Sequence, residues 1–527
     1  MSKGVKRRTL LRALAASTMM AASFSLGALD AAAQSTTAGG RNLTIAVQQI
    51  PDNHDPVSEN TNVNLRVMYS LYDTLVKVDF RNGNKLVPGL ATEWKVIDAK
   101  TVEFKLRPNV VFHNGDTFDA KDVVATFSPV RLGLDKTVPV ESRPFLSGID
   151  RVEVVDNMTV RFQMKTGDAI ILSRFAYYPS QIISATALKE AKSYQDFTAM
   201  DAGTGPYSLV SHEVGKDVVL KKFDKYWGNP KAAADTVTFT AVPELATRVA
   251  GLLSGQFDII TEIGTDEVAQ IEANSATGVA GGPVANIRGL FYDCISSPIS
   301  DPRIRRALNF SIDRETLVLT LYNGRVGIPH DWQMASFGDL YLADRPAAEY
   351  NPEKARALLK EAGYNGEEIV YRTLPTYYAK QLETAQILQS MWKAVGFNIK
   401  LEVKENWDQA TKDTPDRAII DSSFTGYYSD PLGQFWRRFG PESSYTKQGW
   451  WTISPEMQKL GDELTTSTDI KRRREVFGKM LDEFEQDPHG GMLHDLAQFM
   501  GVRKDRIELK PLPSEYLDLT TEGVSFK

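Results

Sequence analysis

The sequence predicts an α/β protein with more than one hydrophobic core. Apolar residues alternate in Thr101–Leu106, which is the pattern of a half-buried strand. Further along, an apolar run at Ile369–Leu374, a helical pattern from about Ala379 to Val395 and a second run at Asn398–Val403 form a β-α-β order that predicts parallel strands. With 527 residues and 42% hydrophobic content, the chain is large enough for two or three domains.

The chain begins with a predicted export signal. Basic residues, including the pair Arg7 and Arg8, precede an uncharged stretch at Ala13–Leu29, and Ala31–Ala33 supplies a small-residue cleavage site. The paired arginines resemble a twin-arginine signal, so residues 1–33 are expected to be removed after export. A membrane anchor is the alternative, but small residues dilute a stretch that is short for a bilayer span. No later segment is apolar enough to span, so the mature protein is not expected to be membrane-embedded.

Charge and cysteine content exclude two classes of protein. The formal net charge is −6 and the Lys and Arg residues are scattered, whereas a nucleic-acid groove needs a basic stripe. The one dense basic cluster, Lys471–Arg474, is interpreted as a solvated helix face. A single cysteine, Cys294, excludes an intramolecular disulfide, so stability must come from burial.

The first half of the chain alternates between helical and strand patterns. Apolar residues from Leu65 to Val76 fall on one face of a predicted amphipathic helix. Thr101–Leu106 and Met158–Met164 alternate with the period of strands, so residues from about 80 to 200 are expected to be β-rich. Between these strands, a turn at His113–Asp116 and a helix start near Asp119 indicate scaffold, with Gly115 able to take positive φ.

Helix signals dominate after residue 290. Asp301 with Pro302 predicts one helix start, and Asp313 begins a second helix that Gly324 can close. Asn351 with Pro352 repeats this pattern in a helix that ends at Gly363.

The sequence lacks the motifs of common enzymes. It contains no G-x-S-x-G, no G-x-x-x-x-G-K-[ST] and no H-E-x-x-H. His489 and His494 are five residues apart, but a metal site needs further ligands. Acid pairs such as Glu405 and Asp408 arise by chance in a chain with 67 acids. We therefore expect no catalytic residues, no metal and no cofactor.

Five blocks in fixed order resemble the periplasmic solute-binding proteins of the dipeptide, oligopeptide and nickel type. These proteins are the binding subunits of ABC importers. The blocks span nearly the whole mature chain, and they lie at Val87–Phe127, Gly203–Gly228, Glu244–Ile259, Asp301–Val318 and Asn351–Tyr364.

The resemblance implies two α/β lobes joined by hinge strands, with an extra β-rich domain inserted in lobe one. We expect lobe one to comprise residues 42–79, 201–290 and 491–527, the inserted domain residues 80–200, and lobe two residues 291–490. Such a protein is periplasmic and monomeric. It captures a small solute between its lobes and delivers the solute to the permease subunits of an ABC transporter.

The resemblance also bears on the ligand. Ser422–Gly440 resembles the lobe-two loop that lines the cleft, where the peptide-binding branch usually places an Asp after Thr-Gly to pair with the peptide ammonium; here that residue is Tyr427. The branch also usually has an Arg for the peptide carboxylate, and residues 373–381 contain none, although Arg372 is close. No histidine lies between His330 and His489, which disfavours a nickel ligand.

Aromatic and polar residues remain as candidate ligand contacts. Aromatic faces beside carboxylates and amides suit the C–H faces and hydroxyl groups of a sugar, whereas a buried peptide terminus needs a charged partner. For each aromatic alone, core packing is the alternative, and Asp430 can instead simply shape its loop. The predicted contacts are Asn53, Tyr377, Tyr378, Trp407, Tyr427, Tyr428, Asp430 and Trp436.

Three hypotheses about function follow. A binding protein for a sugar-containing or opine-like solute leads, a peptide-binding protein of the same transporter class is second, and an exported carbohydrate-active enzyme is a distant third. Under the first hypothesis, simple dipeptides are expected to bind weakly or not at all.

Overall fold

The protein is described here by a computed structural model that covers residues 40–58, 61–129, 131 and 143–527. Contacts divide the chain into Met1–Gly40 and Arg41–Lys527, and all the elements described belong to the second unit. The predicted export signal, with its arginine pair, lies outside the described residues.

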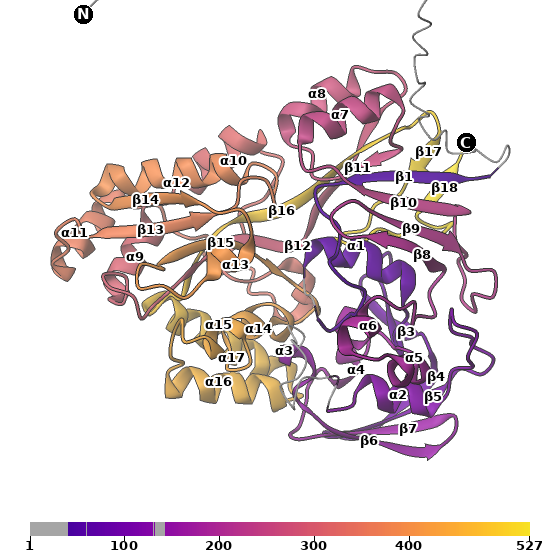
Figure 1. Ribbon diagram of the computed structural model, residues 1–527. Helices are drawn as coiled ribbons and strands as arrows, with labels where there is room; N and C mark the ends of the chain where they lie inside the picture. Colours follow the sequence, from indigo (N-terminus) through magenta and orange to yellow (C-terminus); the bar gives the residue numbers. More distant parts are fainter. Residues whose placement is uncertain (1–39, 59–60, 130, 132–142) are drawn as a thin grey trace, which may run out of the picture. The chain divides into compact units, whose positions relative to one another are not determined.

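A ten-stranded mixed sheet runs through the described chain (Figure 1). Neighbouring strands in this sheet are far apart in sequence, because segments from both ends of the chain meet in it. In spatial order the strands are β14 (Asn398–Val403), β13 (Glu368–Thr373), β15 (Ile419–Thr425), β12 (Gly278–Tyr292), β16 (Gly490–Val502), β11 (Ile259–Ile260), β1 (Asn42–Val47), β10 (Thr236–Ala241), β9 (Asp217–Lys222) and β8 (Tyr207–Glu213).

The central strands β12 and β16 connect the two halves of the sheet. They have 15 and 13 residues and pair antiparallel from Gly278 opposite Val502 to Phe291 opposite Gly490. The pairing is interrupted after Pro283, which has no N–H to donate. Gly281 has φ +107, and a Cβ there would lie 1.9 Å from the carbonyl oxygen of Gln498, so only glycine fits this crossing.

The first predicted helix is shorter than its apolar pattern. Helix α1 covers Asn62–Leu71, and the pattern continues into strand β2 at Val76–Asp79. The carbonyls of Thr74 and Leu75 accept hydrogen bonds from the N–H groups of Leu90 and Ala91, both at 2.9 Å. These tertiary bonds hold the segment extended, which local periodicity cannot indicate.

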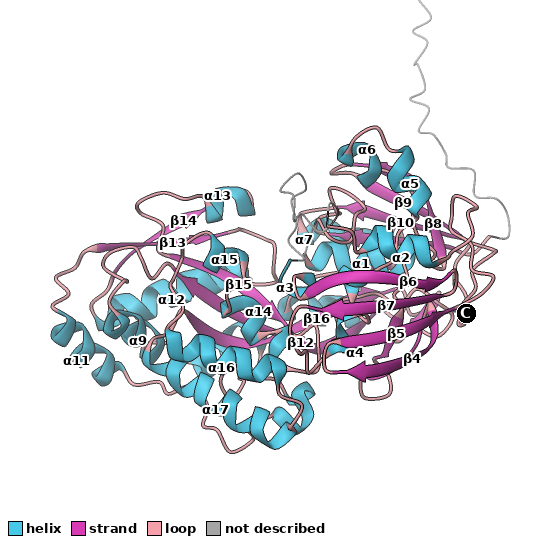
Figure 2. Cartoon of the chain, turned by 90° about the horizontal axis from the view of Figure 1, so that it is seen from below, coloured by secondary structure: helices cyan, strands magenta, loops and turns pink. Residues whose placement is uncertain are grey.

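A separate four-stranded antiparallel sheet confirms the β-rich prediction (Figure 2). Its order is β4 (Ala91–Asp98), β5 (Thr101–Leu106), β7 (Thr159–Met164) and β6 (Ile149–Asp156). One face buries Val102, Phe104 and Phe162. The predicted turn and helix follow β5: Gly115 has φ +95, and Asp119 caps α2 (Ala120–Thr126) in a capping box.

The helices after residue 300 begin where the sequence predicts. Asp301, Asp313 and Asn351 each accept a backbone N–H as N-caps, and Gly363 closes the third helix with positive φ. The second helix is closed by Asn323 in the left-handed region, one residue before the predicted Gly324. These helices are α9 (Pro302–Phe310), α10 (Arg314–Tyr322) and α11 (Pro352–Ala362).

The predicted β-α-β unit is confirmed. Strands β13 and β14 pair in parallel, and α12 (Gln381–Val395) connects them. The buried side chains of α12 include Leu388 and Trp392, and Gly396 ends the helix with φ +110.

A helical hairpin follows, made of α16 (Pro455–Thr466) and α17 (Ile470–Gln486). The prediction that Lys471–Arg474 is a solvated helix face is wrong at Arg473, which is 4% exposed. Its guanidinium forms two hydrogen bonds with Asp430, at 2.7 and 2.9 Å, because a buried charge needs a partner of opposite charge.

Shorter elements complete the described chain, in which no helix is long and apolar enough to cross a bilayer. They are β3 (Lys85–Pro88), α3 (Arg143–Leu146), α4 (Ile171–Arg174), η1 (Tyr178–Ser180), α5 (Ala185–Glu190), α6 (Tyr194–Thr198), α7 (Leu245–Ser254), α8 (Thr265–Glu272), η2 (Ala335–Leu340), α13 (Trp407–Thr411), η3 (Pro431–Gly433), α14 (Phe435–Phe439), α15 (Ser444–Lys447), β17 (Ile507–Leu509) and β18 (Val524–Phe526).

Candidate functional site

Three of the predicted contacts form one aromatic group. The Tyr377 ring lies 4.8 Å from the Tyr378 ring and 5.2 Å from the Trp407 ring, measured between centroids. The tyrosines are both 6% exposed and pack with Val63 and Leu496, which come from the two ends of the chain. These aromatics therefore lie where the segments predicted as lobe one and lobe two meet.

Tyr427 and Tyr428 form a second group at the end of β15. The Tyr427 ring lies 4.9 Å from the ring of Phe145, and the Tyr428 ring lies 5.1 Å from that of Tyr177. Both tyrosines are almost fully buried, at 4% and 2% exposure. Their partners come from the segment predicted as the inserted domain.

Asp430 and Trp436 have contacts that organise the loop itself. Asp430 pairs with Arg473 and accepts the N–H of Leu432 at 3.0 Å, so both its oxygens are engaged by the protein. Trp436 lies against α16, where a Cβ on Gly461 would come within 1.9 Å of its ring. These contacts support the alternatives to ligand contact, which are loop shaping for Asp430 and core packing for Trp436.

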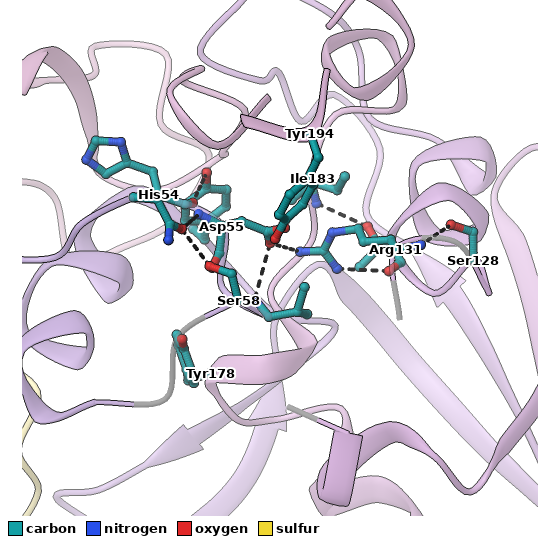
Figure 3. A network of polar contacts seen from close by, with 12 residues as sticks. His54, Asp55, Ser58, Ser128, Arg131, Tyr178, Ile183 and Tyr194 are labelled. Atoms are coloured by element: carbon teal, nitrogen blue, oxygen red, sulfur yellow. Dashed lines mark hydrogen bonds and ion pairs between the residues drawn. The ribbon is translucent and has the colours of Figure 1, made fainter. Parts of the chain in front are cut away.

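Asn53 belongs to a polar network before α1, of which Asp55, Ser58, Arg131 and Tyr194 are labelled in Figure 3. Its Oδ1 accepts hydrogen bonds from the N–H of Asp55 at 2.9 Å and the hydroxyl of Ser58 at 2.6 Å. Asp55 is buried and pairs with Arg131 at 2.7 Å, and it also accepts the hydroxyl of Tyr194 at 2.9 Å. The network holds Asn53, Asp55 and Ser58 together and links them to Arg131 and Tyr194.

Glu515 is a buried acid that the sequence analysis did not select. Its Oε1 accepts a hydrogen bond from the amide of Asn286, which also donates to the hydroxyl of Thr425 at 3.0 Å. Its Oε2 is buried and has no hydrogen-bond partner among the described residues. Burial raises the pKa of Glu515 to about 7, so its charge is sensitive to a nearby cation.

Arg437 is a buried base in the same region. Its guanidinium carbon lies 4.8 Å from the centre of the Tyr427 ring, and its Nε donates to the carbonyl of Gly433 at 3.3 Å. Its Nη2 is buried without a hydrogen-bond partner in the described part of the chain. Burial and the neighbouring charge of Arg438 lower the pKa of Arg437 to about 9.

Tyr427 lies within the electrostatic reach of both charges. Burial raises the pKa of Tyr427 to about 12, the positive charge of Arg437 opposes that rise, and Glu515 adds to it. The carboxylate and the guanidinium near Tyr427 each keep one polar atom without a hydrogen-bond partner among the described residues.

Other buried arginines near the aromatic groups are already paired with acids. Arg66 contacts Glu262, and Arg288 contacts Asp421 at 2.5 Å while lying 3.7 Å from the Tyr378 ring centre. Arg372 is also engaged, by Asp416 at 2.9 Å and by backbone carbonyls. Arg372 is thus already paired with an acid, although its Nε is buried without a hydrogen-bond partner among the described residues.

A small cavity of about 30 Å³ adjoins these residues. Its walls come from α1, the ends of β12 and β15, and the C-terminal segment, and they include Leu65, Tyr69, Tyr177, Tyr427 and Glu515. The lining includes the carboxylate of Glu515 and aromatic faces, whereas Arg437 lies outside it.

The sequence holds only weak signals of the two charges. Glu515 stands among prolines and apolar residues in "PLPSEYLDL", and Arg437 is in the aromatic run "FWRRF". A charge in an apolar setting suggests burial, but only the fold shows that the two segments meet.

The histidines and acids weighed as catalytic or metal-binding have other surroundings. Burial lowers the pKa of His494 to about 3, and its Nδ1 lies 2.7 Å from the carbonyl of Asp495. Glu405 accepts a hydrogen bond from Gln409 at 3.1 Å and is exposed. Within the described ranges, no three His, Cys, Asp or Glu side chains group as metal ligands would.

The fold matches solved periplasmic binding proteins. The dipeptide-binding protein of a Pseudoalteromonas species, solved with Met-Leu, superposes with a TM-score of 0.82 over 92% of this chain and 100% of its own, at 20% identity. The agropinic-acid complex of AgaA from Agrobacterium tumefaciens superposes with a TM-score of 0.78 over 90% and 95% of the two chains, at 26% identity. The chain thus has the two-lobed α/β fold of these proteins, with the extra antiparallel sheet.

Sequence comparison identifies the family. Residues 85–446 match the family described as bacterial extracellular solute-binding proteins, family 5 Middle, so the chain belongs to that family. The dipeptide-binding protein of Escherichia coli is 27% identical over 438 residues, which cover 77% of this chain and 80% of the relative. The glutathione-binding protein GsiB of Pectobacterium atrosepticum is 27% identical over 71% of each chain. The protein is the substrate-binding component of an ABC importer and is not an enzyme.

Proposed function

We propose that this protein captures a small amino-acid-derived solute, with a peptide as the first candidate. The observation that carries the proposal is that two buried charges lie near Tyr427: Arg437 is 4.8 Å from the centre of its ring, and Glu515 lines the same small cavity as Tyr427. A cationic group of the ligand would face Glu515, and a carboxylate would face Arg437. Buried charges are costly without partners, so both are suited to a ligand that brings the opposite charges.

The peptide candidate draws support from the relatives. The curated proteins named above bind dipeptides or glutathione by their names. The usual Asp anchor is replaced by Tyr427, but Glu515 can supply the missing negative charge from the C-terminal segment. The expectation that simple dipeptides bind weakly loses its main physical reason.

An opine is the second candidate. AgaA, solved with agropinic acid, is more similar in sequence to this chain than the dipeptide complex is, at 26% against 20% identity. An opine carries a carboxylate for Arg437 and hydroxyl groups for the aromatic faces. A plain sugar fits less well, since it would leave both buried charges without partners.

The proposal includes the transport cycle. The ligand would bind between the two lobes. Lobe one would comprise residues 42–79, 201–290 and 491–527, lobe two residues 291–490, and the inserted domain residues 80–200. A monomer in the periplasm would close on its ligand and dock on the permease subunits. Export through the twin-arginine route remains a proposal based on Arg7 and Arg8.

The first prediction tests the ligand class by calorimetry with Met-Leu and its N-acetyl and C-amide derivatives. We expect Met-Leu to bind tightest. In the wild type, each free terminus should raise the affinity about tenfold or more over its blocked derivative, as for buried charged hydrogen bonds. Glu515→Gln should remove the preference for the free amine, and Arg437→Met should remove the preference for the free carboxylate. Arg325→Met, at an exposed position, is the matched control.

Two outcomes contradict parts of this proposal. If all three peptides fail to bind while an opine such as agropinic acid binds and depends on Arg437, the peptide candidate is wrong and the opine candidate stands. If an uncharged sugar binds tightly and neither variant changes its affinity, the assignment of Glu515 and Arg437 to the ligand fails.

A further inference from the structure

A second cavity lies in the region of the helical hairpin. Its volume is about 610 Å³, and it is lined by α9, the start of α10, residues 331–332 and 345–349, the end of α17 and β16. It shares no lining residue with the cavity beside Tyr427. Its size is in the range of cavities that hold small organic ligands.

The floor of this hairpin cavity is apolar and held by packing. Phe310, Trp332, Phe484 and Met492 line it and are each less than 9% exposed. The Trp332 ring packs edge to face, with its centroid 5.9 Å from that of Phe484 and 5.2 Å from that of Phe439. A flat ligand would therefore meet a rigid aromatic wall, which keeps the ordering cost of binding low.

Two guanidinium groups line the same cavity without a carboxylate partner in the described chain. The Nε of Arg306 is buried and has no hydrogen-bond partner among the described residues. Arg314 is 4% exposed and donates to the carbonyls of Met492 at 2.8 Å and Ile312 at 3.1 Å. Burial lowers the pKa of Arg314 to about 10, because carbonyl oxygens do not neutralise its charge.

Four acids line the cavity, and three of them, Asp331, Asp482 and Glu485, share the single guanidinium of Arg345. Asp331 contacts Arg345, which also pairs with Asp482 at 2.7 Å. Glu349 pairs with Lys354 at 3.0 Å. Arg306 and Arg314 are the lining bases for which the described residues supply no carboxylate partner.

The rim of the cavity is accessible. Pro346–Glu349 are exposed and belong to no helix or strand. Backbone hydrogen bonds hold the chain on either side of this segment. The N–H of Arg345 donates to the carbonyl of Leu342 at 3.1 Å, and the N–H of Asn351 donates to the carbonyl of Phe310 at 2.8 Å. A small molecule can enter past this short loop.

We propose that the hairpin cavity is a second binding site, for a small carboxylate with a flat apolar body. The carboxylate accepts hydrogen bonds from Arg306 and Arg314, and the flat body lies on Phe310 and Trp332. Charge-assisted hydrogen bonds and aromatic contact together account for the selectivity. This site is independent of the solute proposed for the Tyr427 region.

The test uses 4-fluorobenzoate as the probe, with 4-fluorobenzyl alcohol as its neutral counterpart, and follows binding by fluorine NMR relaxation. We expect the mature protein to bind the carboxylate and not the alcohol. Arg306→Met should weaken binding by about tenfold. Ala348→Glu, on the exposed rim, should weaken it about threefold by repulsion, and it decides the matter if Arg306→Met does not fold. Arg437→Met and Arg325→Met should bind like the wild type.

Three results would overturn the proposal. If the wild type binds neither probe, the cavity is not a site for this class of molecule. If it binds both probes equally, the site does not select a carboxylate. Loss of binding in Arg437→Met with full binding in Arg306→Met would place the probe in the Tyr427 region instead. Circular dichroism and melting curves of every variant exclude unfolding as the cause of a loss.

Discussion

Glu515 is a single side chain whose burial makes the stability of the whole protein depend on pH. Burial raises its pKa from 4.5 to about 7, so between these values the folded protein holds a proton that the unfolded chain releases. The stabilisation from this proton is complete below pH 4.5 and is lost as the pH rises through 7. A bound ligand with a cationic group should lower the pKa of Glu515 again, because it favours the charged carboxylate.

The second prediction is that Glu515→Gln removes this dependence. From pH 5 to pH 8 the unliganded wild type should lose up to about 3 kcal/mol of unfolding free energy relative to the variant, as an upper limit from the pKa change. Urea unfolding at both pH values measures the difference. Glu508→Gln, at an exposed position, is the matched control. Equal pH dependence in wild type and Glu515→Gln would contradict the raised pKa.

At the scale of elements, the ion pair of Asp430 and Arg473 fixes the loop after β15 against the helical hairpin. Both side chains are buried, at 5% and 4% exposure, and the pair has two hydrogen bonds. The loop also carries Tyr427, Tyr428 and Arg437. The pair thus positions residues that we propose to contact the ligand. The pair itself does not contact the ligand in this proposal.

The third prediction follows from that geometry. Asp430→Ala should lower the unfolding free energy by about 3–5 kcal/mol, because it leaves the guanidinium of Arg473 buried without its partner. Thermal and urea unfolding measure the loss. Glu456→Ala, on the exposed surface of α16, should change stability by less than about 1 kcal/mol. Full stability of Asp430→Ala together with weaker ligand binding would show that Asp430 contacts the ligand, as the sequence analysis predicted.

At the scale of the whole molecule, polar contacts away from the pairing of β12 with β15 also join the segments assigned to the two lobes. The amide of Gln48 donates to the carbonyl of Tyr377 at 3.4 Å, and Lys380 at the start of α12 contacts Asp266 on α8. Exposed ion pairs contribute little, so a ligand that adds contacts on both sides can shift the equilibrium between open and closed forms.

The fourth prediction concerns that equilibrium. Saturating ligand should reduce the radius of gyration in small-angle scattering, and Arg437→Met should need a higher ligand concentration for the same change, in proportion to its loss of affinity. The Lys380→Ala variant should compact like the wild type. An unchanged radius of gyration with a tightly bound ligand would rule out closure of the lobes.

Much of the fold could be predicted because its signals are local. The caps Asp119, Asp301 and Asn351 satisfy backbone N–H groups within one turn, and alternation along β5 and β7 gives their buried face directly. The end of α1 could not be predicted, since hydrogen bonds from residues 89–91 hold its continuation extended.

The sequence by itself determined the α/β class, several helix boundaries, the absence of an intramolecular disulfide and the resemblance to a transporter family, because these depend on periodicity, composition and contiguous motifs. Only the tertiary structure decided which charges share the interior. It brings Glu515 to Asn286 and Tyr427, places Arg437 under the same ring, and occupies Asp430 with Arg473. Burial and pairing depend on residues far apart in the chain, and no local pattern records which of them meet.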